Sequence, residues 1–412
     1  MLGLKSLRQP DVPVADAIQL LIVQPTPFCN IDCDYCYLPN RNATARLDPA
    51  TWREVLRKVF ASGLTREELS IVWHAGEPLA VPISHYATLL DVIDEFPTRP
   101  ARLRHSIQTN GMLITDEWCK FIAANDIHIG VSIDGPAFLH DRHRKDRQGR
   151  GTHDRVMKGI ECLRRHDIDF HVIAVITSDS LDHADEVFGF FLDQRIRRVG
   201  FNVEELEGVH NICSLLDGNL EDRIRSFWRR LYVLQQESGG AVCIREFERA
   251  YEVIANGPPA ITTELSMRWS SQLAPFGIVT VDCKGNVSSF SPELIGSKSV
   301  RYGDFIFGNI FESELKELRN KPQFVRVARD IREGVRLCER KCQYFSLCGG
   351  GSPSNKYFEN GSLASTETMY CRTTIQMPID IVLADLEKSV PSPPDSGSLT
   401  GTSDKRPVAH RG

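Results

Sequence analysis

The chain has 412 residues, of which 42% are hydrophobic and 25% are charged, and its formal net charge at pH 7 is -5. This composition predicts a globular protein of two or three structural units and excludes a chain that is disordered throughout. The charge gives no indication of a nucleic-acid partner, and no signal peptide or membrane-spanning apolar run is present, so we expect a cytoplasmic protein without a membrane partner.

Short apolar runs alternate with amphipathic stretches through the first half of the chain. The expected strands are Ile18–Val23, Leu69–His74, Leu103–Gln108, Ile127–Ile133, Phe170–Ile176 and Val199–Val203. The expected helices between them are Pro49–Ala61, Ser84–Glu95, Asp116–Ala124, His153–His166 and Ser180–Gln194. Strands that alternate with helices of this length need right-handed crossovers and a parallel sheet, so the pattern predicts an α/β fold with an open or closed barrel.

The alternation ends near Asn202, where two helical stretches, Leu220–Ser238 and Arg245–Ala255, are expected before a β-hairpin beyond Pro275. The last residues are rich in Pro, Ser, Gly and Asp, which predicts a disordered tail. The predicted organisation is a segment at 1–16, a barrel at 17–235, a helical bridge at 236–274, a cysteine-rich domain at 275–388 and the tail at 389–412.

Three cysteines, Cys29, Cys33 and Cys36, follow the first expected strand with the spacing C-x3-C-x2-C. Three thiolates can bind a four-iron cube and leave one iron without a protein ligand, and this iron can chelate the amino and carboxylate groups of S-adenosylmethionine. The alternatives are a zinc knuckle, a disulfide framework or chance. Structural zinc sites need four ligands in closed pairs, and no fourth lies at a suitable distance.

Polar turns that contain glycine follow the next three strands, at His74–Pro78, Gln108–Gly111 and Ser132–Pro136. Loops at the carboxyl ends of parallel strands converge on one cavity, and polar groups there suit a ribose and an amino-acid carboxylate. Gly76 would let the backbone pass close to such a ligand. Each turn taken alone is equally consistent with a structural role, because Asn-Gly and Asp-Gly are common turn formers.

A second cysteine cluster lies in a glycine-rich region near the end of the chain. Its members are Cys338, Cys342, Cys348 and Cys371, enough to ligate one complete iron–sulfur cluster, although a structural zinc site of four cysteines has the same requirement. The remaining cysteines, Cys119, Cys162, Cys213, Cys243 and Cys283, are expected to be small buried hydrophobic residues.

The N-terminal triplet followed by an aromatic residue resembles the signature of the radical S-adenosylmethionine (radical SAM) superfamily. His74–Pro78 is similar to its GGEP element, with Ala75 in place of the first glycine. The resemblance implies a partial, TIM-like (β/α)6 barrel with S-adenosylmethionine as cofactor. The residues that it places at the cofactor are Ala75, Gly76, Glu77, Gln108, Asn110, Ser132, Asp134 and Arg144. Arg144 is a candidate partner for a carboxylate, and a solvated charge run over 142–147 is the alternative.

The C-terminal cysteines resemble the SPASM extension of radical enzymes that modify peptides and proteins, which usually carries two auxiliary clusters. Two positions where that family has cysteine are Phe290 and Ser352 here. Both belong to the inner auxiliary cluster, so the resemblance implies that this cluster is lost as a unit. We therefore predict two [4Fe–4S] clusters, one at the N-terminal triplet and one auxiliary.

The chain is most similar to cyclophane-forming maturases that act on glycine-rich precursor peptides, in the phrases Gln24–Ile31, Gly200–Glu205, Ser291–Leu294 and Gly349–Phe358. The resemblance implies hydrogen abstraction from a Cβ of a ribosomally made precursor by a 5'-deoxyadenosyl radical, followed by a carbon–carbon crosslink to an aromatic ring. A flavodoxin or ferredoxin would supply the electron. Candidate bases by placement are Glu204, Glu205, Glu293 and His74.

Other functions remain open. An anaerobic sulfatase-maturase type of enzyme would make formylglycine, but this chain has Ser291-Pro292 where those enzymes place an aspartate. A thioether-forming or epimerising peptide enzyme is a related alternative, and an iron–sulfur redox sensor is the alternative that is not an enzyme. We expect no leader-binding domain before the barrel, so that the barrel mouth and the extension, or a separate partner, would hold the precursor.

Overall fold

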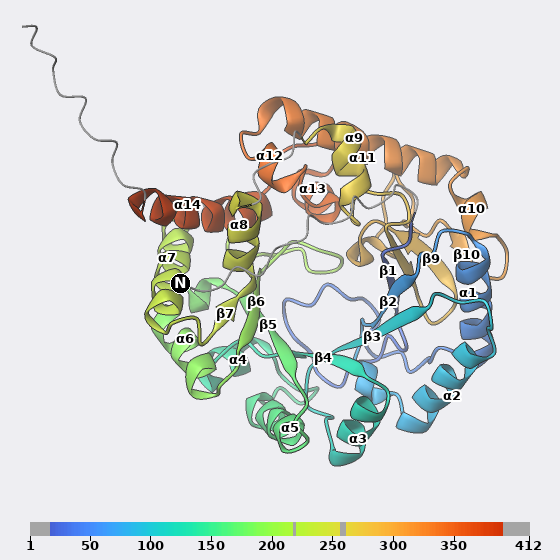
Figure 1. The fold of residues 1–412 in the computed structure, drawn as a ribbon, viewed down its shortest axis with the longest axis horizontal. Helices are drawn as coiled ribbons and strands as arrows, with labels where there is room; N and C mark the ends of the chain where they lie inside the picture. Colours follow the sequence, from blue (N-terminus) through green and yellow to red (C-terminus); the bar gives the residue numbers. More distant parts are fainter. Residues whose placement is uncertain (1–16, 217–219, 256–260, 390–412) are drawn as a thin grey trace, which may run out of the picture.

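The computed structural model describes residues 17–216, 220–255 and 261–389 (Figure 1). Its strands form a ten-stranded sheet with the order β10-β9-β8-β1-β2-β3-β4-β5-β6-β7. The predicted N-terminal segment at 1–16 and residues 390–412 of the predicted tail lie outside the described residues.

The central part of the sheet is a partial barrel of six parallel strands that are neighbours in sequence order. They are β1 (Leu20–Val23), β2 (Glu68–Trp73), β3 (Arg102–Thr109), β4 (Ile127–Ser132), β5 (Phe170–Ile176) and β6 (Arg198–Val203). Every bound lies within two residues of the prediction, because each strand is an apolar run between turn-forming residues. The predicted α/β barrel is confirmed.

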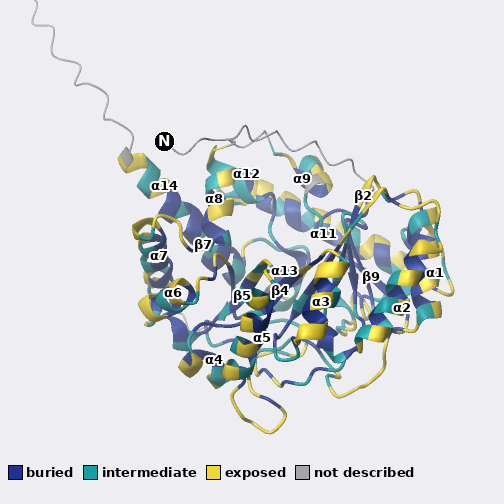
Figure 2. Cartoon of the chain, turned by 60° about the horizontal axis from the view of Figure 1, so that its bottom comes forward, coloured by how far each residue is buried: buried dark blue, intermediate teal, exposed yellow. Residues whose placement is uncertain are grey.

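Helices cover the outer face of these strands and expose their polar sides (Figures 1 and 2). They are α1 (Pro49–Ala61), α2 (Ile83–Asp94), α3 (Asp116–Ala124), α4 (Ala137–His143), α5 (His153–Arg165) and α6 (Ala184–Asp193). The prediction missed α4. It also began α6 four residues early, because Thr177 and Ser180 form a capping box around a separate 3-10 turn, Ser178–Ser180.

The core between sheet and helices is organised around Trp73 at the end of β2. Its side chain is fully buried, with ring centroids 5.2 Å from both Trp52 of α1 and Tyr86 of α2. The Trp73 indole donates to His105 Nδ1 at 3.3 Å, so its single polar atom has a partner. This packing fixes the carboxyl end of β2, from which the turn at 74–78 leaves the sheet.

The C-terminal extension joins the barrel through the sheet itself. β8 (Ile278–Val281) pairs parallel with β1 and forms an antiparallel hairpin with β9 (Asn286–Ser289), which in turn pairs with β10 (Gly308–Asn309). The short strand β7 (Cys243–Ile244) continues the opposite edge next to β6. The predicted boundary at 274–275 therefore falls just before a strand of the common sheet.

The other helices lie at the ends of the sheet. They are α7 (Glu221–Glu237), α8 (Arg245–Ala255), α9 (Thr263–Trp269), α10 (Leu315–Leu318), α11 (Pro322–Lys341), α12 (Phe345–Cys348), α13 (Pro353–Asn360) and α14 (Met377–Ser389), with a π-helical turn at Cys371–Gln376. The helix α14 packs against α7 and α8, which returns the end of the extension to the barrel (Figure 1).

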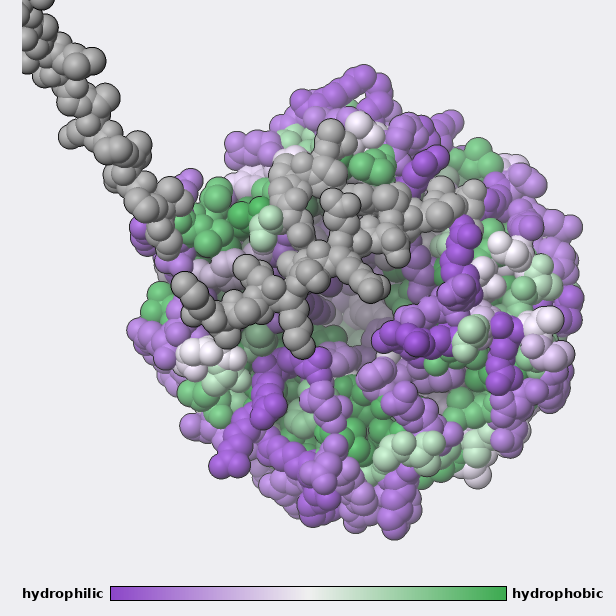
Figure 3. Space-filling model, in the orientation of Figure 1, coloured by the Kyte–Doolittle hydropathy of each residue, from purple (hydrophilic) through white to green (hydrophobic). Residues whose placement is uncertain are grey.

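Among the described helices, none combines the length and the apolar character that a bilayer crossing requires. Hydrophilic residues dominate the outline of the face drawn in Figure 3, and hydrophobic residues lie between them in smaller groups.

Replacing Trp73 with alanine is expected to lower the free energy of unfolding by about 3–5 kcal/mol, because the change removes a buried ring and leaves a cavity. Urea unfolding followed by circular dichroism measures this loss. The control is Val233→Ala on the exposed side of α7, where the side chain is 40% exposed and a change within about 0.5 kcal/mol is expected. Equal stability of the two variants would contradict the role given to Trp73.

Candidate functional site

The loop that carries Cys29, Cys33 and Cys36 leaves the carboxyl end of β1 and is held by backbone contacts from distant segments. Cys29 N donates to Arg41 O at 3.0 Å, and Asp32 N donates to Lys145 O at 2.7 Å. The Arg147 guanidinium donates to the Cys29 carbonyl at 2.8 and 3.0 Å. The three cysteines are therefore fixed near one another, with Cys36 more exposed than the other two.

The surroundings of these thiols suit a bound cluster. Burial raises the pKa of the Cys29 thiol to about 12, and it also raises the pKa of Cys33, because nearby groups solvate a thiolate poorly. The Asn110 amide is 3.8 Å from Cys29 Sγ and is a weak donor at that distance. Iron supplies the positive charge that makes thiolates stable in such a site, so the donor set fits the cluster predicted from the spacing.

The turn after β2 packs directly on the cysteine loop. Ala75 and Gly76 have φ values of 71° and 67°, in the left-handed region. A Cβ on Gly76 would lie 2.3 Å from the Thr26 carbonyl oxygen and 2.7 Å from that of Phe28. The close approach expected at Gly76 is therefore made to the chain segment before Cys29, and any larger residue would push that segment away.

The Glu77 carboxylate joins this turn to the turn after β3. It is fully buried and accepts from Thr109 Oγ1 at 2.7 Å, from Asn110 N at 2.8 Å and from Leu79 N at 2.9 Å. Burial raises the pKa of Glu77 to about 7, although these three donors favour the charged form. Glu77 thus positions Asn110, whose amide also donates to Asn30 Oδ1 at 2.7 Å in the cysteine loop.

Gln108 and Ser132 meet across neighbouring strands, with Gln108 Nε2 donating to Ser132 Oγ at 3.0 Å. Asp134 and Arg144 form a buried bidentate ion pair at 2.8 and 2.9 Å. Burial opposes ionisation of Asp134, but the Arg144 guanidinium overcomes it and holds the pKa of Asp134 below its ordinary value. Arg144 is therefore no part of a solvated charge run, and its carboxylate partner in this structure belongs to the chain itself.

A cavity of about 1180 Å³, partly open to solvent, lies at the carboxyl ends of the barrel strands. Of the predicted residues, Ala75 and Asp134 do not line this cavity. Those that do are Cys29, Cys33, Cys36, His74, Gly76, Glu77, Gln108, Asn110, Ser132, Arg144, Glu204, Glu205 and Glu293. Residues assigned to the cluster, the cofactor and the chemistry thus share one space, as expected for loops at this end of a barrel.

The wall away from the cysteines carries three carboxyl groups, from Glu205, Glu207 and Glu293. Desolvation raises the pKa of Glu205 and of Glu293 to about 7, and the charge of Glu293 adds to the shift of Glu205. The pKa of Glu207 is raised by the same causes. Glu205 accepts from Asn355 Nδ2 at 2.6 Å, whereas Glu293 Oε2 has no hydrogen-bond partner within the described part of the chain.

The other two candidate bases already have partners. Glu204 accepts from His210 Nε2 at 2.9 Å, from Ser214 N at 3.0 Å and from the Ser214 hydroxyl. Burial lowers the pKa of His74 to about 4, so its ring is neutral near pH 7, and Nε2 lies 3.3 Å from the Tyr37 hydroxyl. The geometry therefore favours Glu293 over Glu204 and His74.

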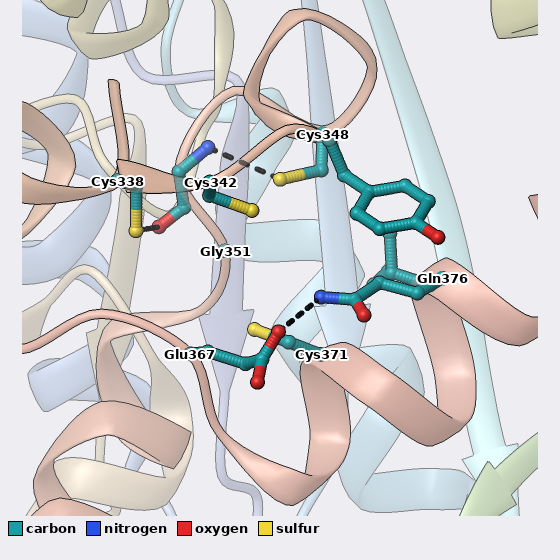
Figure 4. A pocket seen from close by; sticks show the side chains of 10 residues that line it. Cys338, Cys342, Cys348, Gly351, Glu367, Cys371 and Gln376 are labelled. Atoms are coloured by element: carbon teal, nitrogen blue, oxygen red, sulfur yellow. Dashed lines mark hydrogen bonds between the residues drawn. The ribbon is translucent and has the colours of Figure 1, made fainter. Parts of the chain in front are cut away.

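The second cysteine cluster closes around a small pocket in the extension (Figure 4). Cys338 and Cys342 lie at the end of α11, Cys348 ends α12, and Cys371 begins the π-helical turn. All four side chains point into this pocket. Gly349, Gly350 and Gly351 have φ values of 71°, 118° and 73°, which explains why the turn between Cys348 and α13 needs three glycines.

The donors around these sulfurs indicate thiolates. The ammonium group of Lys356, which is 2% exposed, lies 3.2 Å from Cys338 Sγ, and a buried ammonium needs a negative partner. Thr368 Oγ1 donates to Cys371 Sγ at 3.2 Å and Gly350 N donates to Cys348 Sγ at 3.4 Å. Hydrogen bonds of this kind are typical of iron–sulfur sites, where they tune the potential of the cluster.

Sulfur spacing separates a cluster from a single zinc ion. Four thiolates on one tetrahedral zinc lie about 3.8 Å apart, as follows from bonds of about 2.3 Å. All four cysteines are described residues, and no three of their sulfurs fall within 4.8 Å of one another. The wider spacing suits ligands that bind different iron atoms.

Aromatic packing occupies the region where the family has its inner auxiliary cluster. Phe290 is fully buried, with ring centroids 6.3 Å from Phe307 and 5.4 Å from Phe324. Ser352 is buried and lies 2.9 Å from the Ser354 hydroxyl. This packing supports the prediction that the inner cluster is lost.

The remaining cysteines differ from the prediction in two respects. Cys243 is only partly buried, and its thiol lies 2.8 Å from Glu248 Oε1, so it is not a buried hydrophobic residue. Cys119 and Cys162 are buried but lie together, with their sulfurs 3.4 Å apart. Cys213 and Cys283 are buried, as expected.

Several cavity residues were missed from the sequence. Tyr35 donates to Asp134 Oδ2 at 2.5 Å, and its ring lies 5.4 Å from the Arg144 guanidinium. Arg41 donates to the Cys33 carbonyl at 3.0 Å. Glu207 was also missed, although the run Glu204-Glu205-x-Glu207 was a signal for a third carboxylate. Arg41 gave no comparable signal, because its role depends on the path of the loop.

Comparison with known proteins places this site. The family model for the radical SAM superfamily matches residues 23–191. The chain is 41% identical over 390 residues to uncharacterized protein sll1766 of Synechocystis sp., covering 94% of this chain and 96% of that protein. It is 24% identical over 357 residues to the serine-type anaerobic sulfatase-maturating enzyme of Bacteroides thetaiotaomicron, covering 84% of each.

Solved structures share the fold over nearly the whole chain. Native anSMEcpe with bound AdoMet and the Cp18Cys peptide matches with a TM-score of 0.72 and 22% identity, over 90% of this chain and 98% of that one. SuiB of Streptococcus suis bound to precursor peptide SuiA matches with a TM-score of 0.62 and 18% identity, over 87% and 76%. The chain belongs to the radical SAM superfamily and is an enzyme that uses S-adenosylmethionine and [4Fe–4S] clusters, one of them auxiliary.

Proposed function

We propose that this enzyme modifies a ribosomally made precursor peptide by joining a side-chain Cβ to a nearby aromatic ring, which closes a cyclophane. One observation carries the proposal: a single cavity has the three cluster cysteines on one wall and the carboxyl group of Glu293, without a hydrogen-bond partner among the described residues, on another. The chemistry needs a radical source and a proton acceptor that face the same substrate.

The cluster and S-adenosylmethionine, when bound, supply a 5'-deoxyadenosyl radical that removes a hydrogen atom from the substrate. Cys29, Cys33 and Cys36 would hold this cluster, and Asn110 and Glu77 fix the loops around it. The resemblance puts the nucleoside beside Gln108, Ser132 and the Asp134–Arg144 pair. Together these loops would exclude water from the reacting centre.

Closing a carbon–carbon bond to an aromatic ring also requires the ring to lose one proton and one electron. The cavity offers Glu293 for the proton, since its pKa of about 7 allows a large fraction of the free carboxylate at neutral pH. Glu205 and Glu207 raise the basicity of this wall through their charges. The auxiliary cluster held by Cys338, Cys342, Cys348 and Cys371 is a candidate acceptor for the electron.

A peptide substrate agrees with the fold. SuiB was solved with its precursor peptide and anSMEcpe with the Cp18Cys peptide, and both share this architecture. The cavity is open to solvent on one side, so a peptide can enter from the face where the barrel meets the extension. The reductant, for which a flavodoxin or ferredoxin is expected, stays a prediction.

Formation of formylglycine is the second candidate. The sulfatase-maturating enzyme of Bacteroides thetaiotaomicron aligns over 84% of its length, which favours this activity. The hairpin residue Ser291 is fully buried, and no carboxylate stands beside it before Glu293. Glu293 would then take the proton in either reaction, and the product separates the two.

Co-expression of the enzyme with a short glycine-rich peptide, containing spaced aromatic residues and encoded beside its gene, is expected to yield a product lighter by two hydrogen atoms per crosslink. Tandem mass spectrometry should then show no fragmentation between the joined residues. Oxidation of serine to formylglycine removes the same two hydrogens, but its aldehyde reacts with hydroxylamine. A hydroxylamine adduct, or an unchanged peptide, would contradict crosslinking, and Cys33→Ala serves as the inactive control.

The variant Glu293→Gln is expected to slow product formation by about 100-fold or more, the usual contribution of a general base, while 5'-deoxyadenosine still forms. Because the base must be deprotonated, the wild-type rate should rise with pH through about 7, and the variant should lose this rise. Quantitative mass spectrometry of product and 5'-deoxyadenosine against pH measures both. The exposed Glu312→Gln is the matched control, and an unchanged rate in Glu293→Gln would exclude Glu293 as the base.

A further inference from the structure

Two helices on the outer side of the barrel place four metal-ligating residues together, away from both cysteine clusters described above. Asp116 and Cys119 are three residues apart on α3, and Cys162 and His166 are four residues apart at the end of α5. Residues with these separations lie on the same face of a helix, and the two helices pack on each other. Each helix therefore presents two ligands to the other.

The ligand atoms already lie close together. One nitrogen of His166 and the sulfurs of Cys119 and Cys162 are within 4.8 Å of one another. The two sulfurs are 3.4 Å apart, and Asp116 Oδ1 lies 3.3 Å from Cys162 Sγ and 2.9 Å from His166 Nε2. Donors on one tetrahedral zinc ion are separated by about 3.3–3.8 Å, so small outward movements would open the space for an ion.

Burial and charge suit a divalent cation. Cys119 and Cys162 are 0% and 3% exposed, which shields thiolates from water and oxidants, whereas His166 and Asp116 reach the surface and leave a path for entry. Two thiolates and one carboxylate around a divalent ion leave a net charge of -1. The Arg165 guanidinium, 3.1 Å from Asp116 Oδ1, balances this charge.

Other uses of the four residues are less complete. Packing as small hydrophobic residues explains the two cysteines but not why both sulfurs face a histidine and a carboxylate. An ion pair between His166 and Asp116 explains those two residues but does not need the sulfurs. A disulfide between Cys119 and Cys162 would not need His166 or Asp116. A metal site accounts for all four.

We propose that Cys119, Cys162 and His166, completed by Asp116, form a tetrahedral binding site for zinc or a similar divalent transition metal, separate from the iron–sulfur clusters. Binding displaces the two thiol protons and ties the start of α3 to the end of α5. The site is structural in character, because four protein ligands leave no open position for a substrate. It does not depend on the proposed peptide chemistry.

The test uses the holoenzyme with both clusters reconstituted, to which zinc chloride is added in slight excess before removal of loosely bound ions. Elemental analysis is expected to give one zinc per chain with an unchanged iron content. Zinc-edge X-ray absorption should show two sulfur ligands at about 2.3 Å and two lighter ligands at about 2.0 Å. Cys162→Ala and His166→Ala should lose the zinc, while Cys283→Ala, a buried cysteine elsewhere, should keep it.

Iron content and the circular dichroism spectrum show whether each variant is folded, and Asp116→Asn changes an exposed side chain that the fold does not need. This last variant is expected to bind zinc about tenfold or more weakly. Zinc that displaces iron, zinc retained by Cys162→Ala, or a Cys119–Cys162 disulfide in the purified holoenzyme would each overturn the proposal. Unchanged affinity in Asp116→Asn would remove Asp116 from the site.

Discussion

The buried carboxylate of Glu77 is the contact on which the rest of the site depends. Its three donors come from the turn after β2 and the turn after β3. The same turn presses Gly76 against the segment before Cys29, and Asn110 reaches Asn30 in the cysteine loop. Three loops from three strands are thus held by one charged group in a place where charge is costly, which fixes the cluster cysteines relative to the barrel.

The second constraint is the pairing of β8 with β1. This pairing makes the extension part of the barrel sheet and sets Glu293, five residues after β9 starts to turn away at Ser289 and Phe290, over the mouth of the barrel. The extension supplies Asn355, which holds Glu205, from the helix beside the auxiliary cysteines. One cavity therefore receives its radical-generating wall from the barrel and its carboxylate wall from the junction with the extension.

The elements that were predictable from the sequence are those with a local signal. The six barrel strands and the helices between them are apolar runs of the right length, and the two cysteine groups announce themselves by spacing. The partners inside the site were less predictable. Arg144 was expected to meet a carboxylate of a ligand, but it pairs with Asp134, ten residues earlier, because the short helix α4 folds it back. The free and engaged glutamates of the run 204–207 also looked alike in sequence, and only the positions of His210 and Ser214 distinguish Glu204.

The most direct test of the central claim is electron paramagnetic resonance of the reduced, reconstituted Cys348→Ala protein, in which the auxiliary site is broken and the N-terminal cluster is left alone. The account predicts about four iron atoms per chain and a spectrum that shifts when S-adenosylmethionine is added, because the fourth iron is open to the cofactor. A spectrum that S-adenosylmethionine leaves unchanged, or a cluster that persists after the additional change Cys33→Ala, would contradict it.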